Sequence, residues 1–141
     1  MHQSTATREI VLQFLYTCEV TKINIFSAGF WQQFLKQFLI YKISKRKARL
    51  YVKTIFDHQS EIDDLITLHL GKEWTIDRIH KVDLNILRMF VAEILVFKNP
   101  PRVVLNETVN LAKKYSDDTS RKFINGLADK LLNNELAAIV S

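Results

Sequence analysis

The sequence predicts an all-α fold, a compact bundle of about six to seven helices around a buried central helix. The 141 residues include only 3 glycines and 2 prolines, so tight turns are few, which argues against a β fold. Apolar residues make up 48% of the chain and recur at helical spacing. The stretch Val82–Phe97 is apolar almost all the way round a helical wheel, which is typical of a helix packed on every side.

The length is that of one domain, which we expect to span residues 1–141. The net charge of +5 permits an anionic partner without requiring one. The single cysteine, Cys18, cannot form an internal disulfide and lies on an apolar stripe, so we expect a buried thiol in a reducing cytoplasm. No uncharged apolar segment reaches the roughly 18 residues of a membrane span, and the start resembles no signal peptide.

The first helix is expected over residues 5–20, with Ser4 or Thr5 as its N-cap and one apolar stripe facing the core. Tyr16 projects from the opposite side, and Leu12 lies beside it. An exposed pair of this kind would suit a protein partner, although scattered apolar side chains are also normal on surfaces.

The second helix is expected over residues 28–42, after the N-cap Ser27. The third begins after Ser44 and runs to about Leu70. Gly71 follows it at the position where a glycine often ends a helix.

The first turns of the third helix are strongly basic. Cations there oppose the helix dipole, so they do not serve helix stability. They form either a solvated face or a phosphate-contacting strip, the Lys45–Lys53 strip. Further on, His58 and Glu61 are three residues apart, but a metal site needs more converging ligands, so we interpret His58 and His69 as partly buried histidines and predict no metal.

A connector follows over residues 74–81, with a helical turn from Asp77, and then the central helix. Within it, Arg88 and Glu93 need partners from other helices because a buried charge is costly when unpaired. The next helix starts at Pro101, since proline favours the first helical position.

A polar loop is expected over residues 116–120 and the last helix over residues 121–136, with Ser120 as its N-cap. Gly126 in mid-helix costs about 1 kcal/mol against alanine, which suggests close packing or a close ligand. The chain has no phosphate-binding glycine loop, no paired-cysteine motif and no nucleophile motif, so we predict neither an enzyme nor a cofactor.

Four motifs resemble the bacterial transcription antitermination factor NusB family. They occur in family order with family-like spacing, and together they are specific. Arg8–Glu9 and Gln13–Tyr16 extend the match to the first helix. The motifs are Val82–Arg88 (VDLNILR), Ala92–Leu95 (AEIL), Asn106–Lys114 (NETVNLAKK) and Lys122–Lys130 (KFINGLADK).

The resemblance implies a NusB-like helical protein without enzymatic activity. It implies binding to boxA-type leader RNA, notably of ribosomal RNA operons, as a single strand. It also implies pairing with the tenth protein of the small ribosomal subunit, and action with RNA polymerase and other Nus factors to read through terminators. The same fold occurs as a domain of an rRNA cytosine methyltransferase.

The resemblance also implies two sets of site residues. Arg8 is the only match to an arginine-rich run at the start of the first helix, where this chain has residues Ser4–Thr7 instead. Phe123 either stacks on a splayed base or belongs to the core. The RNA side comprises Arg8, Thr119, Ser120, Arg121, Lys122 and Phe123. The protein-partner side comprises Tyr16 and Asp83, although Asp83 is also placed to stabilise its helix N-terminus.

Two other functions stay open on the sequence. The missing arginines weaken RNA binding, because each lost phosphate contact lowers affinity, so the chain is alternatively a protein-interaction adaptor with weak RNA affinity. It is also alternatively a regulatory domain related to the rRNA methyltransferase. Some exposed apolar side chains would equally suit a homodimer.

Overall fold

The computed structural model of the chain describes residues 4–38 and 43–136. Over these ranges the secondary structure consists of seven α-helices, one 3-10 turn and one π-helical turn, without a strand, which confirms the all-α prediction. The elements are α1 (Thr5–Thr21), α2 (Ala28–Leu35), α3 (Lys45–Asp57), α4 (Gln59–Leu68), η1 (Ile76–Arg78), α5 (Lys81–Leu95), α6 (Pro101–Tyr115), α7 (Asp118–Leu131) and η2 (Leu132–Leu136).

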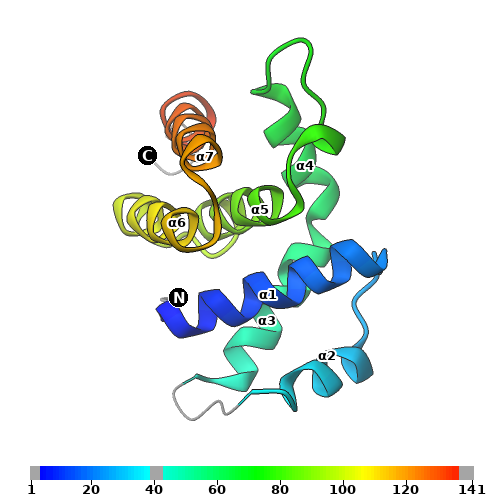
Figure 1. The fold of residues 1–141 in the computed structure, drawn as a ribbon. Helices are drawn as coiled ribbons and strands as arrows, with labels where there is room; N and C mark the ends of the chain where they lie inside the picture. Colours follow the sequence, from blue (N-terminus) through cyan, green and yellow to red (C-terminus); the bar gives the residue numbers. More distant parts are fainter. Residues whose placement is uncertain (1–3, 39–42, 137–141) are drawn as a thin grey trace.

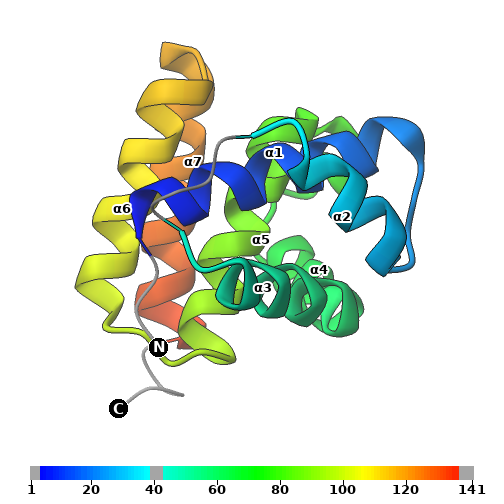
Figure 2. The ribbon, with the colours of Figure 1, turned by 90° about the horizontal axis from the view of Figure 1, so that it is seen from below.

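Helix α5 is the centre of the fold, as its sequence predicts. Every residue from Asp83 to Ile94 is buried. The helix packs against α1, α3, α4, α6 and α7. Figure 1 shows it between α6 and α7 on one side and α1, α3 and α4 on the other, and Figure 2 shows the same arrangement from below.

Aromatic side chains attach α2 to this centre. The Phe14 ring on α1 meets the Trp31 ring edge-on, with ring centroids 4.9 Å apart, and the Phe34 ring at 5.1 Å. Trp31 is only 2% exposed, so its ring is part of the core. Edge-to-face contacts of this kind add to the gain from burial alone.

Three of the predicted helix starts are confirmed by their N-caps. The Ser4 hydroxyl accepts a hydrogen bond from the Thr7 N–H at 3.1 Å, and Ser27 and Ser44 cap α2 and α3 in the same way. Each cap satisfies an N–H group that the helix itself leaves unpaired. Helix α6 begins at Pro101, as expected.

The middle of the chain differs from the prediction. Helix α2 ends at Leu35, and the expected residues 39–42 lie outside the described part. The expected third helix is two helices, α3 and α4, which meet at His58. His58 leaves helical geometry, with φ −111° and ψ 12°, although its N–H still donates to the Thr54 carbonyl. The glycine prediction is also wrong, because α4 ends at Leu68 and Gly71 has no positive φ.

The structure also differs from the expectations for Leu12 and for the packing at Gly126. Leu12 is 1% exposed, so the surface pair with Tyr16 does not exist, while Tyr16 itself is 40% exposed. A Cβ added at Gly126 would meet no atom within 4 Å outside the backbone of its own helix, so close packing does not require the glycine. The alternative, a close ligand, stays a prediction. The stripe of α1 is therefore wider than the wheel indicates, and the glycine of α7 faces open space.

Candidate functional site

The start of α7 carries most of the expected RNA-binding residues, but it begins earlier than predicted. Asp117, not Ser120, is the N-cap, and its carboxylate accepts a hydrogen bond from the Ser120 N–H at 2.7 Å. Thr119 and Ser120 therefore lie in the first helical turn. Aspartate caps a helix about as well as serine does, so residue type alone does not favour Ser120 over the earlier Asp117.

Asp117 changes what this helix end offers to an anion. The hydrogen bond from the Ser120 N–H holds the pKa of Asp117 below its usual range, so the carboxylate is charged at neutral pH. Asp118 adds a second acid, and its Oδ1 lies 3.1 Å from Nη2 of Arg121. A phosphate would therefore meet the side chains of this turn more readily than its backbone N–H groups.

The Phe123 ring is half-buried and lies against Trp74, which sequence reasoning missed. The ring centroids are 5.9 Å apart and the planes are 29° from parallel, while Trp74 is 49% exposed. Phe123 thus packs against the core, as one of the two interpretations expects, and its ring also contacts a surface tryptophan. Stacking on an RNA base stays a prediction. The signal in the sequence was a lone tryptophan in a polar connector.

The two expected protein-partner residues lie in one pocket, which we call the α1–α7 pocket. It has a volume of about 390 Å³, and its lining includes Tyr16 of α1 and Asp83 of α5. The remaining lining residues come from the start of α5, the end of α6, the α6–α7 connection and the start of α7. They are His80, Lys81, Val82, Tyr115, Ser116, Asp117 and Ser120. Residues of both expected sets therefore meet at one place.

Asp83 is a buried wall of this pocket. It is 4% exposed, and its Oδ1 accepts a hydrogen bond from the Ser116 hydroxyl at 2.6 Å. Its Oδ2 lies 4.0 Å from Nδ1 of His80. Since Asp83 also stands in the first turn of α5, it stabilises that helix end and ties the α6–α7 connection to it.

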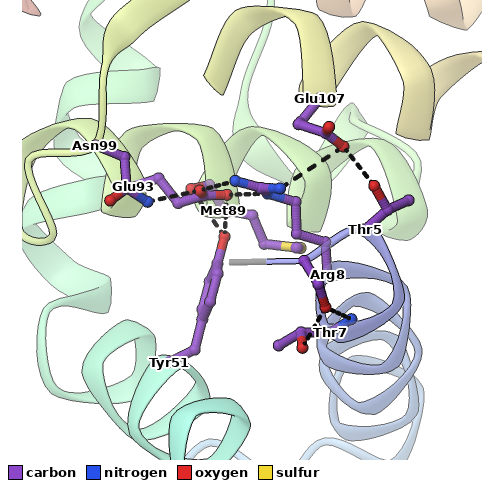
Figure 3. A network of polar contacts seen from close by, with 9 residues as sticks. Thr5, Thr7, Arg8, Tyr51, Met89, Glu93, Asn99 and Glu107 are labelled. Atoms are coloured by element: carbon purple, nitrogen blue, oxygen red, sulfur yellow. Dashed lines mark hydrogen bonds and ion pairs between the residues drawn. The ribbon is translucent and has the colours of Figure 1, made fainter. Parts of the chain in front are cut away.

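Arg8 does not lie where an RNA-contacting residue would. It is 1% exposed, and its guanidinium faces the Glu93 carboxylate, with Nε 2.9 Å from Oε2 and Nη2 2.6 Å from Oε1 (Figure 3). Burial alone would lower the pKa of Arg8, but the hydrogen bond and the charge of Glu93 raise it. The structure thus corrects the expectation of a surface phosphate ligand, because Arg8 joins α1 to α5.

Glu93 is the centre of that network. Its carboxylate also accepts from the Tyr51 hydroxyl at 2.7 Å and from the Asn99 side-chain amide at 2.9 Å. Burial and the neighbouring Glu93 charge raise the pKa of Tyr51 well above its usual value, so Tyr51 remains a donor. The prediction that Glu93 needs partners from other helices is confirmed.

Arg88 has partners of the same kind. Its guanidinium contacts Asp63 of α4 at 2.8 and 2.9 Å, and Nη1 lies 2.5 Å from Oε1 of Glu19 on α1. The two buried cations of the central bundle therefore hold α1, α4 and α5 in one arrangement. Breaking such a pair by removing one partner is expensive, which makes the arrangement rigid.

Other candidate chemistry is limited in the part of the chain that the structure describes. Among the side chains that the structure describes, no three His, Cys, Asp or Glu are grouped as a metal site would need. Burial raises the pKa of the Cys18 thiol to about 11, which suits a buried small side chain. No helix in the described ranges has the length and apolar character to cross a membrane.

Comparisons with curated proteins place the chain beside antitermination factors. The transcription antitermination protein NusB of Macrococcus caseolyticus is 46% identical over 84 residues, which cover 60% of this chain and 64% of that protein. The protein of the same name from Enterococcus faecalis is 44% identical over 84 residues, covering 59% and 54%. The alignments thus span less than two thirds of these curated relatives.

Solved structures match over nearly the whole length. NusB of T. maritima has a TM-score of 0.80 and 28% identity, with 99% of this chain and 98% of that chain covered. A solved complex of antitermination factors NusB and NusE with double-stranded RNA has a TM-score of 0.80 and 28% identity, covering 92% and 95%. The sequence profile of the NusB family matches residues 5–133, and this chain therefore belongs to the NusB family.

Proposed function

We propose that this protein is a transcription antitermination factor that binds boxA-type leader RNA, notably of ribosomal RNA operons. It binds together with the tenth protein of the small ribosomal subunit, which is the NusE of the solved complex. The assembly then joins RNA polymerase and other Nus factors in the cytoplasm and promotes read-through of terminators. The observation that carries the proposal is the α1–α7 pocket, which brings Tyr16 and Asp83 beside the start of α7.

The RNA side of this proposal comprises the first turns of α7. Thr119 and Lys122 are exposed, and Arg121 is partly exposed, so a hydroxyl and two cations face solvent within one turn. Ser120 lines the pocket, where it would lie between RNA and the protein partner. Phe123 and the Trp74 ring stacked on it offer a surface for a base, since base–aromatic stacking contributes about 1–3 kcal/mol.

The protein side comprises Tyr16 and the pocket around it. An exposed tyrosine supplies a large contact area at low conformational cost and a hydroxyl that can hydrogen-bond. Asp83 would act mainly by holding the pocket wall, because its carboxylate is already bound by Ser116. We therefore expect Tyr16 to be the more sensitive of the two positions.

A second candidate function has specific support. Arg8 is buried, the expected arginine run is absent, and Asp117 occupies the Ser120 N–H at the start of α7. All three reduce the attraction for phosphate. An adaptor that binds its protein partner well and RNA weakly is the function these features favour, and the two candidates differ in measurable salt dependence.

Salt-dependent RNA binding separates the candidates. With two phosphate-contacting cations, the slope of log K against log salt should be about −1.4 for single-stranded RNA, and Arg121→Gln should flatten it by about 0.7. Lys113→Gln, which removes an exposed cation on α6, is the matched control and should leave the slope unchanged. Duplex RNA belongs in the same series, because the solved relative holds a duplex.

Tyr16→Asp separates the two sides. It should weaken binding of the ribosomal protein at least about tenfold, as loss of a tyrosine hot spot does, and leave RNA affinity within about twofold. Equal loss of both affinities with an unchanged circular dichroism spectrum would refute the division into two sides. A salt slope near zero with intact partner binding would favour the adaptor.

A further inference from the structure

A second concave surface lies between α2 and α3, and it shares no lining residue with the α1–α7 pocket. Its volume is about 530 Å³, within the range of ligand-sized clefts. In Figure 1, α2 and α3 lie on the opposite side of α1 and α5 from α7. We call this surface the α2–α3 groove, and an occupant here would not compete with the proposed RNA site.

The floor of the groove is aliphatic. Leu35 of α2 and Leu50 of α3 line it, together with the edge of the core residue Trp31. Leu50 is 46% exposed although it lies next to fully buried Tyr51. An exposed leucine within a groove walled by two helices is the kind of anchor point that an apolar side chain of a partner fills.

The rim of the groove is cationic. Lys45, Arg46, Arg49 and Lys53 all line it from α3. Arg46, Arg49 and Lys53 follow one face of the helix over seven residues, roughly 10 Å of axis. Three of these four cations stand in the first turns of α3, where positive charge opposes the helix dipole and lowers stability. The stability of α3 therefore does not explain why these cations are at this position.

This charge is largely unbalanced within the described residues. Lys53 pairs with Asp57 at 3.0 Å, but both side chains are about half exposed. The Arg49 guanidinium lies 5.7 Å from the Phe26 ring centroid, a contact that holds the cation without neutralising it. Among the side chains of residues 4–38 and 43–134, Lys45 and Arg46 have no ion pair with an acid. The rim is thus complementary to an acidic partner.

The aliphatic character of the floor favours a protein over RNA as that partner. Readers of single-stranded RNA stack bases on exposed aromatic rings. Trp31 is 2% exposed and offers no such ring face, while the accessible part of the floor is the aliphatic side chain of Leu50. Aliphatic anchors flanked by cations at helical spacing instead match an amphipathic helix with carboxylates beside its apolar stripe.

We propose that the α2–α3 groove binds an acidic amphipathic helix of a protein partner. In the complex, leucine-like side chains of the partner pack on Leu35 and Leu50, and its carboxylates pair with Arg46, Arg49 and Lys53. This contact is additional to the proposed binding of RNA and the ribosomal protein. It would let the protein hold another component of its assembly from its other side.

The experiment uses the full chain and three labelled probes in fluorescence anisotropy. The first is a synthetic helical peptide with leucines along one face and glutamates on both flanks. The second has lysines in place of those glutamates, and the third is oligouridylate. We expect the acidic peptide to bind, and the basic peptide to bind at least about tenfold more weakly, because like charges at an interface are strongly unfavourable.

Variants test whether the acidic peptide binds in the α2–α3 groove. Arg46→Glu with Arg49→Glu, and separately Leu50→Asp, should each weaken the acidic peptide at least about tenfold. Lys47→Glu with Lys113→Glu makes the same charge change on exposed side chains outside the groove and should change affinity less than about threefold. Circular dichroism confirms that each variant is folded.

Three results would overturn the proposal. The first is no binding of the acidic peptide above that of the basic one. The second is equal loss in the groove variants and in the control pair, which would mean that only net charge matters. The third is loss of oligouridylate binding in the groove variants with the acidic peptide unaffected, which would assign the groove to RNA. The first two results leave the boxA and ribosomal-protein proposal untouched, since that site lies elsewhere. The third would also count against placing RNA at the start of α7.

Discussion

Replacing Glu93 with glutamine tests the buried network that joins α1 to α5. Glu93→Gln keeps the side-chain shape and removes the charge that faces Arg8. The buried Arg8 guanidinium then loses its bidentate carboxylate, while the Tyr51 hydroxyl and the Asn99 amide lose an ionised acceptor. The network joins α1, which carries Tyr16, to α5, which carries Asp83.

The magnitude follows from burial. Removing one partner of a buried ion pair costs about 3–5 kcal/mol. The lower end applies here, because Glu107 remains 3.7 Å from Arg8 and is 23% exposed. For 141 residues the unfolding entropy is about 0.3 kcal/mol/K, so a loss of about 3 kcal/mol lowers the Tm by about 10 °C.

Urea unfolding with linear extrapolation measures the free energy, and an unchanged m-value shows that the two-state comparison is valid. Asp57→Asn is the control, because it breaks the exposed Lys53–Asp57 pair and should cost less than about 0.5 kcal/mol. A Glu93→Gln loss as small as that of the control would refute the argument that this network carries a large share of the stability.

Three other predictions concern single side chains. Gly126→Ala should raise the free energy of unfolding by about 1 kcal/mol in thermal or urea unfolding, because the added methyl meets no atom within 4 Å and alanine favours the helix. A lower free energy of unfolding would contradict the open space at this position. Asp117→Asn should change the free energy of unfolding by less than about 0.5 kcal/mol, because asparagine is also a good N-cap. It should tighten RNA binding, measured by fluorescence anisotropy, because it removes a carboxylate that repels phosphate. Unchanged RNA affinity would place RNA away from this turn. Burial alone would raise the pKa of Glu9, but hydrogen bonds from Lys114 and Tyr115 lower it. The charged Glu9 carboxylate therefore stabilises the fold at pH values above its unfolded-state pKa of about 4.3, and this stabilisation is lost as the pH falls through its folded-state pKa. Urea unfolding of Glu9→Gln should therefore show a deficit at about pH 7 that vanishes once the pH lies below the folded pKa of Glu9. A deficit that stays constant with pH would show that charge is not the cause.

The central helix was predictable because its pattern has one physical outcome. A segment that is apolar all round can only be buried, and α5 is. The N-caps Ser4, Ser27 and Ser44 were predictable for a similar reason, since each directly precedes a helical pattern.

The break at His58 was not predictable. No glycine or proline marks it, and the buried positions Ile55, Ile62 and Ile66 continue at helical spacing through it. The two helices separate because tertiary contacts orient them differently: α3 packs on both α1 and α5, while α4 is held to α5 by Asp63 and Arg88. Such contacts leave no local signal in a sequence.

Arg8 shows the same limit at the candidate site. The resemblance placed it on the RNA side, and arginines are seldom buried without a partner. That partner, Glu93, is 85 residues away in the chain, so only the folded structure shows the pair. Conversely, the outward position of Tyr16 follows from the helical wheel alone and is confirmed by its 40% exposure.

The most direct test of the account is RNA affinity at one fixed, near-physiological salt concentration, with a boxA-like strand and a scrambled strand of the same composition. Each is measured with and without the tenth protein of the small ribosomal subunit. The account predicts tighter binding of the boxA-like strand and a further gain when the partner is present. Equal, weak binding of both strands, unchanged by a partner that does bind the protein, would contradict the RNA-binding role and leave a protein adaptor.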